Sequence, residues 1–107
     1  LAGAELICLA GFMRFLSYDF VNKWMDRIIN VHPSLLPSVK GVKTHERAIE
    51  SGVRFTGCTI HFVRNNLDEG PIILQAVVPM LPDDTPEILA TRVLYEEHRI
   101  FPLRLRA

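Results

Sequence analysis

Long apolar runs are absent from this sequence of 107 residues. No stretch approaches the about 20 apolar residues that a membrane-spanning helix needs, and the opening residues show no signal-peptide pattern. The 12 basic residues balance the 12 acidic ones, so the formal net charge is zero. The chain therefore lacks both the basic face of a nucleic-acid-binding protein and a polybasic membrane patch. We expect a cytoplasmic protein whose partners are neither nucleic acids nor membranes.

Cysteine is also scarce, because Cys8 and Cys58 are the only two in the chain. They lie far apart in apolar runs, which favours buried reduced thiols over a disulfide and fits the cytosol. Four histidines are present, but none forms a His-x-x-x-His pair and no two cysteines lie close together. A zinc site, the competing class of function, is therefore disfavoured, and we expect no metal.

Short apolar segments alternate with segments of helical character, within a length that suits one domain. We expect strands at 6–10, 28–32, 58–63 and 72–79, and helices at 44–51 and from 86 to about 100. Gly52 suits a left-handed helix end, and Thr85 followed by Pro86 is typical of a helix start.

This order of elements predicts an α/β fold with a mainly parallel open sheet, flanking helices and a late antiparallel addition. Strands that read as buried on both faces are unusual in a sheet of only about four strands. We therefore expect that residues 1–107 are a partial domain whose N-terminal half is missing.

Asn30 and His32 stand two residues apart on a predicted strand, so their side chains share one face at its carboxyl end. An amide can donate to an oxygen that gains negative charge, while an imidazole transfers a proton, so the pair suits acyl transfer. Asp68 lies in a polar turn before Gly70, and beside His32 it would favour the imidazolium and raise the pKa of that histidine. Each residue alone is more often structural than catalytic.

The residues around this pair match a known family along nearly the whole chain. The segment from Asn30 reads Asn-Val-His-Pro-Ser-Leu-Leu-Pro and is followed by Gly41 and His45. Four further segments match in order: 9–14, 57–63, 67–73 and 96–102. Together they closely resemble the glycinamide ribonucleotide formyltransferases. The resemblance implies formyl transfer from 10-formyltetrahydrofolate to the amine of glycinamide ribonucleotide, in de novo purine biosynthesis.

The resemblance also assigns roles to individual residues. Asn30 would hold the formyl oxygen, His32 would be the general acid, and Asp68 would raise the pKa of His32. The folate pocket would be lined by Asn30 and by two segments: Met13, Arg14, Phe15 and Leu16; and Arg64, Asn65, Asn66, Leu67 and Asp68. Phe15 departs from the smaller aliphatic residue that is usual there. The ribonucleotide would meet Leu94, Tyr95, Glu96 and Glu97, with Glu97 accepting from ribose hydroxyls.

Several alternatives remain open. Formyltetrahydrofolate deformylases share the Asn-x-His strand, although Pro33 and the Gly41/His45 pattern fit the ribonucleotide enzymes better. A third hypothesis is a non-catalytic folate-binding fragment, because the family's Gly-Ser-rich phosphate loop has no counterpart here. For the same reason we expect the catalytic activity of the isolated chain to be impaired. His61 either supports the catalytic pair or is a packed strand histidine. We further expect a cis bond between Leu36 and Pro37, and a homo-oligomer remains open.

Overall fold

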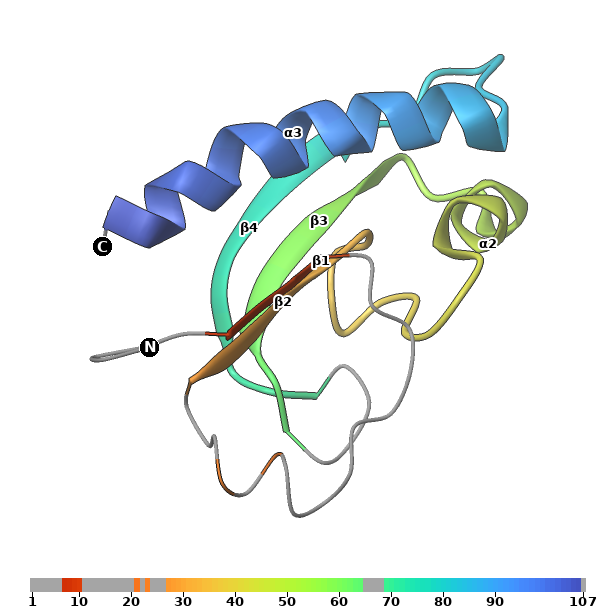
Figure 1. Cartoon of the computed structure of the whole chain (residues 1–107). Helices are drawn as coiled ribbons and strands as arrows, with labels where there is room; N and C mark the ends of the chain where they lie inside the picture. Colours follow the sequence, from red (N-terminus) through yellow and green to blue (C-terminus); the bar gives the residue numbers. More distant parts are fainter. Residues whose placement is uncertain (1–6, 11–20, 22, 24–26, 65–68, 107) are drawn as a thin grey trace.

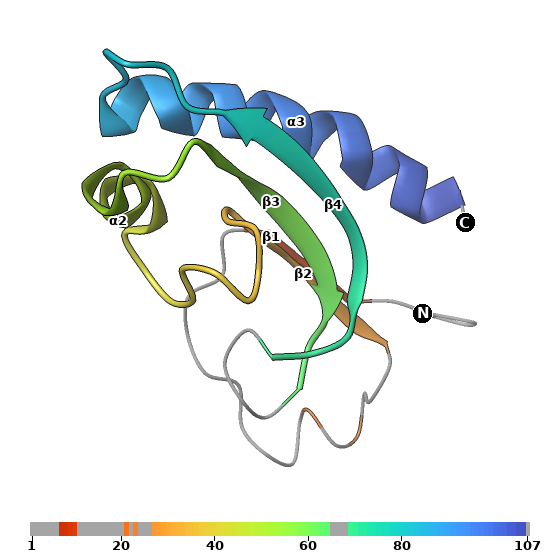
Figure 2. The same cartoon turned by 180° about the vertical axis from the view of Figure 1, so that it is seen from behind.

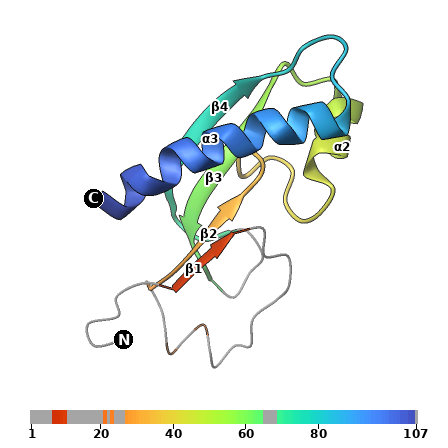
Figure 3. The same cartoon turned by 45° about the horizontal axis from the view of Figure 1, so that its top comes forward.

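The computed structural model describes residues 7–10, 21, 23, 27–64 and 69–106. These form a four-stranded sheet with two helices, in the order β1 (Ile7–Ala10), β2 (Ile28–His32), α2 (Thr44–Ser51), β3 (Phe55–Phe62), β4 (Ile72–Pro79) and α3 (Pro86–Arg106). The strands lie side by side in sequence order, and α3 crosses over β3 and β4 (Figures 1 and 3). The expected α/β class is confirmed.

The pairing of the strands differs from the mainly parallel sheet that we expected. Among the four described strands, β1 and β2 pair in parallel, whereas β2–β3 and β3–β4 are both antiparallel. The reason lies in α2, which sits at the end of the sheet where β2 finishes (Figure 2). A helix on the face of the sheet would have returned the chain for another parallel strand, but from this position β3 runs straight back along β2.

The core lies between the sheet and α3. Alternate residues of three strands point toward the helix: Ile29, Val31, Cys58, Ile60, Ala76 and Val78. They pack against Leu89, Val93 and Ile100 of α3, which recur at helical spacing. This arrangement leaves the other alternate set, including Asn30 and His32, on the opposite face of the sheet.

Local sequence signals explain the ends of the elements. Gly52 follows α2 with φ of 71°, and its amide donates to the Ile49 carbonyl, as expected for a left-handed cap. Thr85 caps α3 by accepting the Ile88 amide at its hydroxyl oxygen, 3.2 Å away. β3 begins at Phe55, three residues earlier than the predicted Cys58, because Phe55 and Thr56 find partners in the long β4.

The loop between β2 and α2 carries the unusual backbone. The Leu36–Pro37 bond is cis, as predicted, and Val39, Gly41 and Lys43 all have left-handed φ angles. In the part of the chain that the structure describes, no helix is long and apolar enough to cross a membrane.

Candidate functional site

The predicted catalytic pair lies at the end of β2 and is buried. Asn30 is 5% exposed and His32 is 1% exposed, on the sheet face that α3 does not cover. Polar side chains that are this deeply buried need hydrogen-bond partners, so their surroundings determine what they can do.

The neighbouring strand provides the partner of Asn30. His61 of β3 stands opposite Asn30 in the register and is 2% exposed. Its Nε2 lies 3.5 Å from Asn30 Nδ2, while its Nδ1 lies 2.9 Å from the Phe62 carbonyl oxygen. A carbonyl only accepts, so Nδ1 carries a proton and Nε2 of the neutral ring can accept from the Asn30 amide. The structure thus places His61 beside the pair, and its supporting role stays a prediction.

The amide of Asn30 keeps further hydrogen-bonding capacity. Its Oδ1 is buried and has no hydrogen-bond partner among the described residues. Its Nδ2 has two hydrogens, of which the contact with His61 uses one. An unsatisfied buried amide is rare in folded proteins and is consistent with a group that meets a ligand.

A second set of contacts ties the loop after β2 to the sheet. Thr59, which stands opposite His32, donates to the Ser34 carbonyl at 2.7 Å and accepts the Leu36 amide at 3.1 Å. Gln75 of β4 donates to the Leu36 carbonyl at 3.0 Å and to the Thr59 hydroxyl at 3.1 Å. The loop is therefore held over the same sheet face as the pair.

The close fit of this loop depends on Gly57. A Cβ at this position would overlap the Ala76 carbonyl and press against the side chain of Leu35. Glycine thus lets β3, β4 and the loop approach one another closely.

The loop also contacts His32 directly. His32 Nε2 lies 2.9 Å from the Val39 carbonyl oxygen. Our reading of the sequence missed Val39, Ser34, Thr59 and Gln75 as parts of this site. Thr59 could have been predicted as part of this site, because it lies two residues before His61 on the same strand and therefore on the same sheet face. The position of the Val39 carbonyl depends on a left-handed turn, which no pattern in the sequence predicts.

The turn after β3 is only partly described. Arg64 lies over the ring of Phe62, 5.7 Å from its centroid, and donates to the Val63 carbonyl. The other predicted folate residues lie outside the described part of the chain: Met13, Arg14, Phe15, Leu16, Asn65, Asn66, Leu67 and Asp68. Asp68 is thus not placed relative to His32.

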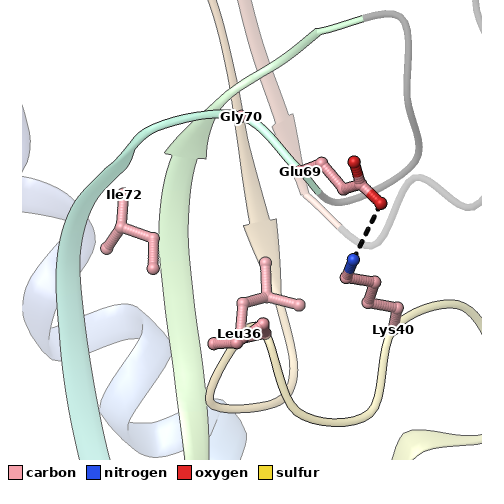
Figure 4. Close-up of a pocket in the computed structure, with 6 residues that line it drawn as sticks. Leu36, Lys40, Glu69, Gly70 and Ile72 are labelled. Atoms are coloured by element: carbon pink, nitrogen blue, oxygen red, sulfur yellow. Dashed lines mark hydrogen bonds and ion pairs between the residues drawn. The ribbon is translucent and has the colours of Figure 1, made fainter.

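Glu69, the residue after Asp68, accepts from Lys40 of the loop at 2.8 Å. Figure 4 shows this ion pair beside Leu36, Gly70 and Ile72, where Pro37 completes the lining of a pocket of about 350 Å³. The ion pair brings the end of the turn next to the loop. Both side chains are substantially exposed, so the pair itself contributes little stability.

The predicted ribonucleotide residues lie on α3. Leu94 and Tyr95 are exposed, and Glu96 forms an ion pair with Arg99 at 2.7 Å. Glu97 is half-buried between the turns of Val93 and Ile100, and burial raises its pKa. α3 packs on the core face of the sheet, whereas Asn30 and His32 lie on its opposite face.

Cys58 lies on the core face of β3 as a free, fully buried thiol. Burial, and then the nearby charge of Glu97, raise the pKa of Cys58 to about 12. Among the described residues, no three histidine, cysteine or acidic side chains gather as a metal site.

Comparison with known proteins identifies this arrangement. The profile of the formyl transferase family matches residues 1–105. The chain belongs to the formyl transferase family. It is 57% identical over 102 residues to the trifunctional purine biosynthetic protein adenosine-3 of Gallus gallus, covering 95% of this chain and 10% of that protein.

Solved structures of the family agree with this assignment. The structure of phosphoribosylglycinamide formyltransferase from Anaplasma phagocytophilum superposes with a TM-score of 0.88 at 54% identity, covering 92% of this chain and 47% of that one. A formyltetrahydrofolate deformylase from Pseudomonas syringae superposes with a TM-score of 0.76 at 36% identity, covering 81% and 29%. The chain thus spans about half or less of the length of each of these three proteins.

Proposed function

We propose that this chain carries the formyl-transfer site of a phosphoribosylglycinamide formyltransferase, within a catalytic domain to which residues 1–107 belong. The observation that carries the proposal is the buried pair of Asn30 and His32 on one sheet face at the end of β2. Support comes from the relatives that share more than half of its residues, which are named for purine biosynthesis or for this reaction.

The reaction class follows from the two side chains. The amine of glycinamide ribonucleotide would attack the formyl carbon of 10-formyltetrahydrofolate, forming a new C–N bond while the bond to the folate nitrogen breaks. The Asn30 amide would donate to the formyl oxygen as that oxygen gains negative charge. His32 would move the proton that leaves the amine and is taken up by the departing folate nitrogen.

The remaining residues would support binding. Asp68 would stabilise the imidazolium form of His32, and the two folate segments, 13–16 and 64–68, would line the donor pocket. Leu94, Tyr95, Glu96 and Glu97 would face the ribonucleotide. We propose that both substrates are small molecules, that the activity is cytoplasmic and that it needs no metal.

The direct test is an assay of the full-length protein with 10-formyltetrahydrofolate, with and without glycinamide ribonucleotide. We expect folate release to require the ribonucleotide and its amine, and the formyl group to appear on that amine. Rapid folate release with water alone, unaffected by the ribonucleotide, would identify a deformylase instead. The deformylase reading is the weaker one, because its structure superposes less closely than that of the transferase.

The role of His32 is tested by His32→Ala in the same assay. Loss of a general acid should lower turnover by about a hundredfold or more. Near-normal turnover of the folded variant would show that another group transfers the proton.

A further inference from the structure

The ring of His32 is oriented by a backbone carbonyl. His32 Nε2 lies 2.9 Å from the Val39 oxygen. A carbonyl oxygen has lone pairs but no hydrogen, so it can only accept. The neutral ring must therefore carry its proton on Nε2, and Nδ1 becomes the ring atom at which a proton is gained or lost.

The position of this carbonyl depends on an unusual turn. Val39 has φ of 52°, a left-handed conformation that is unfavourable for a β-branched residue. Such a conformation persists only where surrounding contacts determine it. In the described loop, the side chain that holds the carbonyl groups of this turn is Ser34.

Ser34 is 1% exposed and reaches across the loop. Its hydroxyl lies 2.6 Å from the Ser38 carbonyl oxygen and 2.9 Å from the Val39 carbonyl oxygen. The single hydroxyl proton is shared between these two acceptors, so both carbonyls are drawn toward Ser34. The Val39 oxygen thus accepts from Ser34 and from His32 at once.

The backbone of Ser34 is itself anchored to two strands. Its amide donates to the His32 carbonyl at 2.9 Å, and its carbonyl accepts from the Thr59 hydroxyl at 2.7 Å. Ser34 therefore links the end of β2, the left-handed turn and β3. The hydroxyl of Ser34 is connected to the ring of His32 through the Val39 carbonyl.

We propose that Ser34 is a positioning residue that, through the Val39 carbonyl, fixes His32 as the Nε2–H tautomer and assigns the transferred proton to Nδ1. This inference rests on the proposed function, in which His32 transfers a proton. In the opposite tautomer the neutral ring would keep its proton on Nδ1, so the transferred proton could not be returned to that atom, and the Nε2 lone pair would face the Val39 oxygen.

The experiment is nitrogen-15 NMR of the full-length protein with labelled histidine, at a pH where the rings are neutral. Protonated and unprotonated ring nitrogens have well-separated shifts, and the His32 signals are assigned from their loss in His32→Gln. We expect wild-type His32 to be in the Nε2–H form. In Ser34→Ala we expect both tautomers, with turnover lowered about tenfold and each KM changed less than about twofold.

Thr59→Val is the matched control, because it removes a buried hydroxyl from the same loop anchor without touching the Val39 carbonyl. We expect Thr59→Val to keep the Nε2–H signal of His32. Mixed tautomers in Ser34→Ala alone would then result from loss of the Ser34 hydroxyl and not from general destabilisation of the loop. A Ser34→Ala protein with an unchanged tautomer and full turnover would overturn the role of Ser34.

The wild-type spectrum tests the tautomer without any variant, so it is decisive even where Ser34→Ala fails to fold. An Nδ1–H ring at His32 would overturn the inference. A protein with the Nε2–H ring but without formyl transfer to the ribonucleotide would instead refute the proposed function, and the tautomer assignment would stand.

Discussion

At the scale of single residues, Asn30 offers the sharpest chemical test. Asn30→Asp has nearly the same shape but places a hydrogen-bond acceptor and a negative charge where, in the proposed reaction, the formyl oxygen would gain its own negative charge. We expect turnover to fall by about a hundredfold or more, as when an oxyanion donor is lost. The measurement is steady-state turnover at saturating substrates.

Gln75→Glu is the control for this change, because it makes the same amide-to-acid substitution on the same sheet face. Gln75 contacts the loop and not the pair, so its loss should be below about tenfold. Equal losses of turnover in the two variants would mean that any added negative charge on this face disrupts the site. That result would contradict the proposed role of Asn30 as the donor to the formyl oxygen.

Cys58 gives a second test at this scale. Its pKa of about 12 leaves almost no thiolate at pH 8, and its side chain is fully buried. We expect iodoacetamide to leave Cys58 unmodified in the folded protein and to alkylate it in denaturant, as read by peptide mass mapping. Rapid alkylation of Cys58 in the native state would contradict the packing of α3 on the sheet.

At the scale of elements, an ion pair fixes the connection between β4 and α3. The Arg92 guanidinium bonds both carboxylate oxygens of Asp84 at 2.7 Å and also donates to the Pro79 carbonyl. Asp84 further accepts the Leu81 amide. The hydrogen bond from Arg92, and then that from Leu81, lower the pKa of Asp84 to about 2.

This pair predicts a pH-dependent difference in melting temperature. Because the folded-state pKa of Asp84 is lowered, the carboxylate stabilises the fold above its unfolded pKa of about 3.9, and this stability is lost as pH falls through about 2. Asp84→Asn should therefore melt at a lower temperature than wild type at pH 7. The gap should close between about pH 4 and pH 2.

Thr85→Ala serves as the control for the Asp84 variant. It removes the cap of α3 and should cost about 1 kcal/mol with no dependence on the charge of Asp84. A gap for Asp84→Asn that persisted unchanged to pH 2 would show that the carboxylate acts by shape alone.

The sequence predicted the elements better than their pairing. Apolar runs and the signals at Gly52 and Thr85 located β2, β4, the end of α2 and the start of α3, because these depend on local chemistry, whereas α3 continues to Arg106, beyond the expected end near residue 100. The direction of β3 depends instead on where α2 packs, and the sequence of residues 44–51 does not predict the packing position of this helix. In the same way, β3 begins at Phe55 only because the long β4 offers it partners.

At the scale of the whole molecule, Glu97 allows the stability of the fold and the proposed ribonucleotide binding to be tested with one variant. Burial raises its pKa, so the folded state favours the protonated carboxyl. The stabilisation from this preference is complete below the unfolded pKa of about 4.3 and is lost as pH rises through the folded-state value. At neutral pH the charged carboxylate therefore destabilises the fold.

Glu97→Gln should accordingly melt at a higher temperature than wild type at pH 7, and the gain should vanish below about pH 4. If Glu97 accepts from ribose hydroxyls, the same variant should raise the KM for glycinamide ribonucleotide about tenfold. Thermal melts and kinetics on one preparation measure both effects. Glu87→Gln, which makes the same change at an exposed position in the first turn of the same helix, should change neither by half as much.

The candidate site was predictable in part for reasons of geometry. Alternation along one strand placed Asn30 and His32 on one face, because a strand has a fixed period of two. Two other contacts could not be predicted in this way. The contact of His32 with Val39 depends on the turn in the loop, and that of Thr59 with Ser34 depends on the strand register, and patterns in a single sequence predict neither. If Glu97→Gln both melts at a higher temperature and binds the ribonucleotide more weakly, the site would include residues of α3.

The strand order has a consequence for synthesis on the ribosome. The four described strands lie in the sheet in the order in which they occur along the chain, so each pairs with the strand made just before it. At about 5–20 residues per second, each of these strands has its partner already synthesised as it emerges, and α3 follows them to cover the apolar face. Folding in this order exposes the apolar side of the sheet until α3 is released, so a nascent chain stalled before α3 should be the species that chaperones bind.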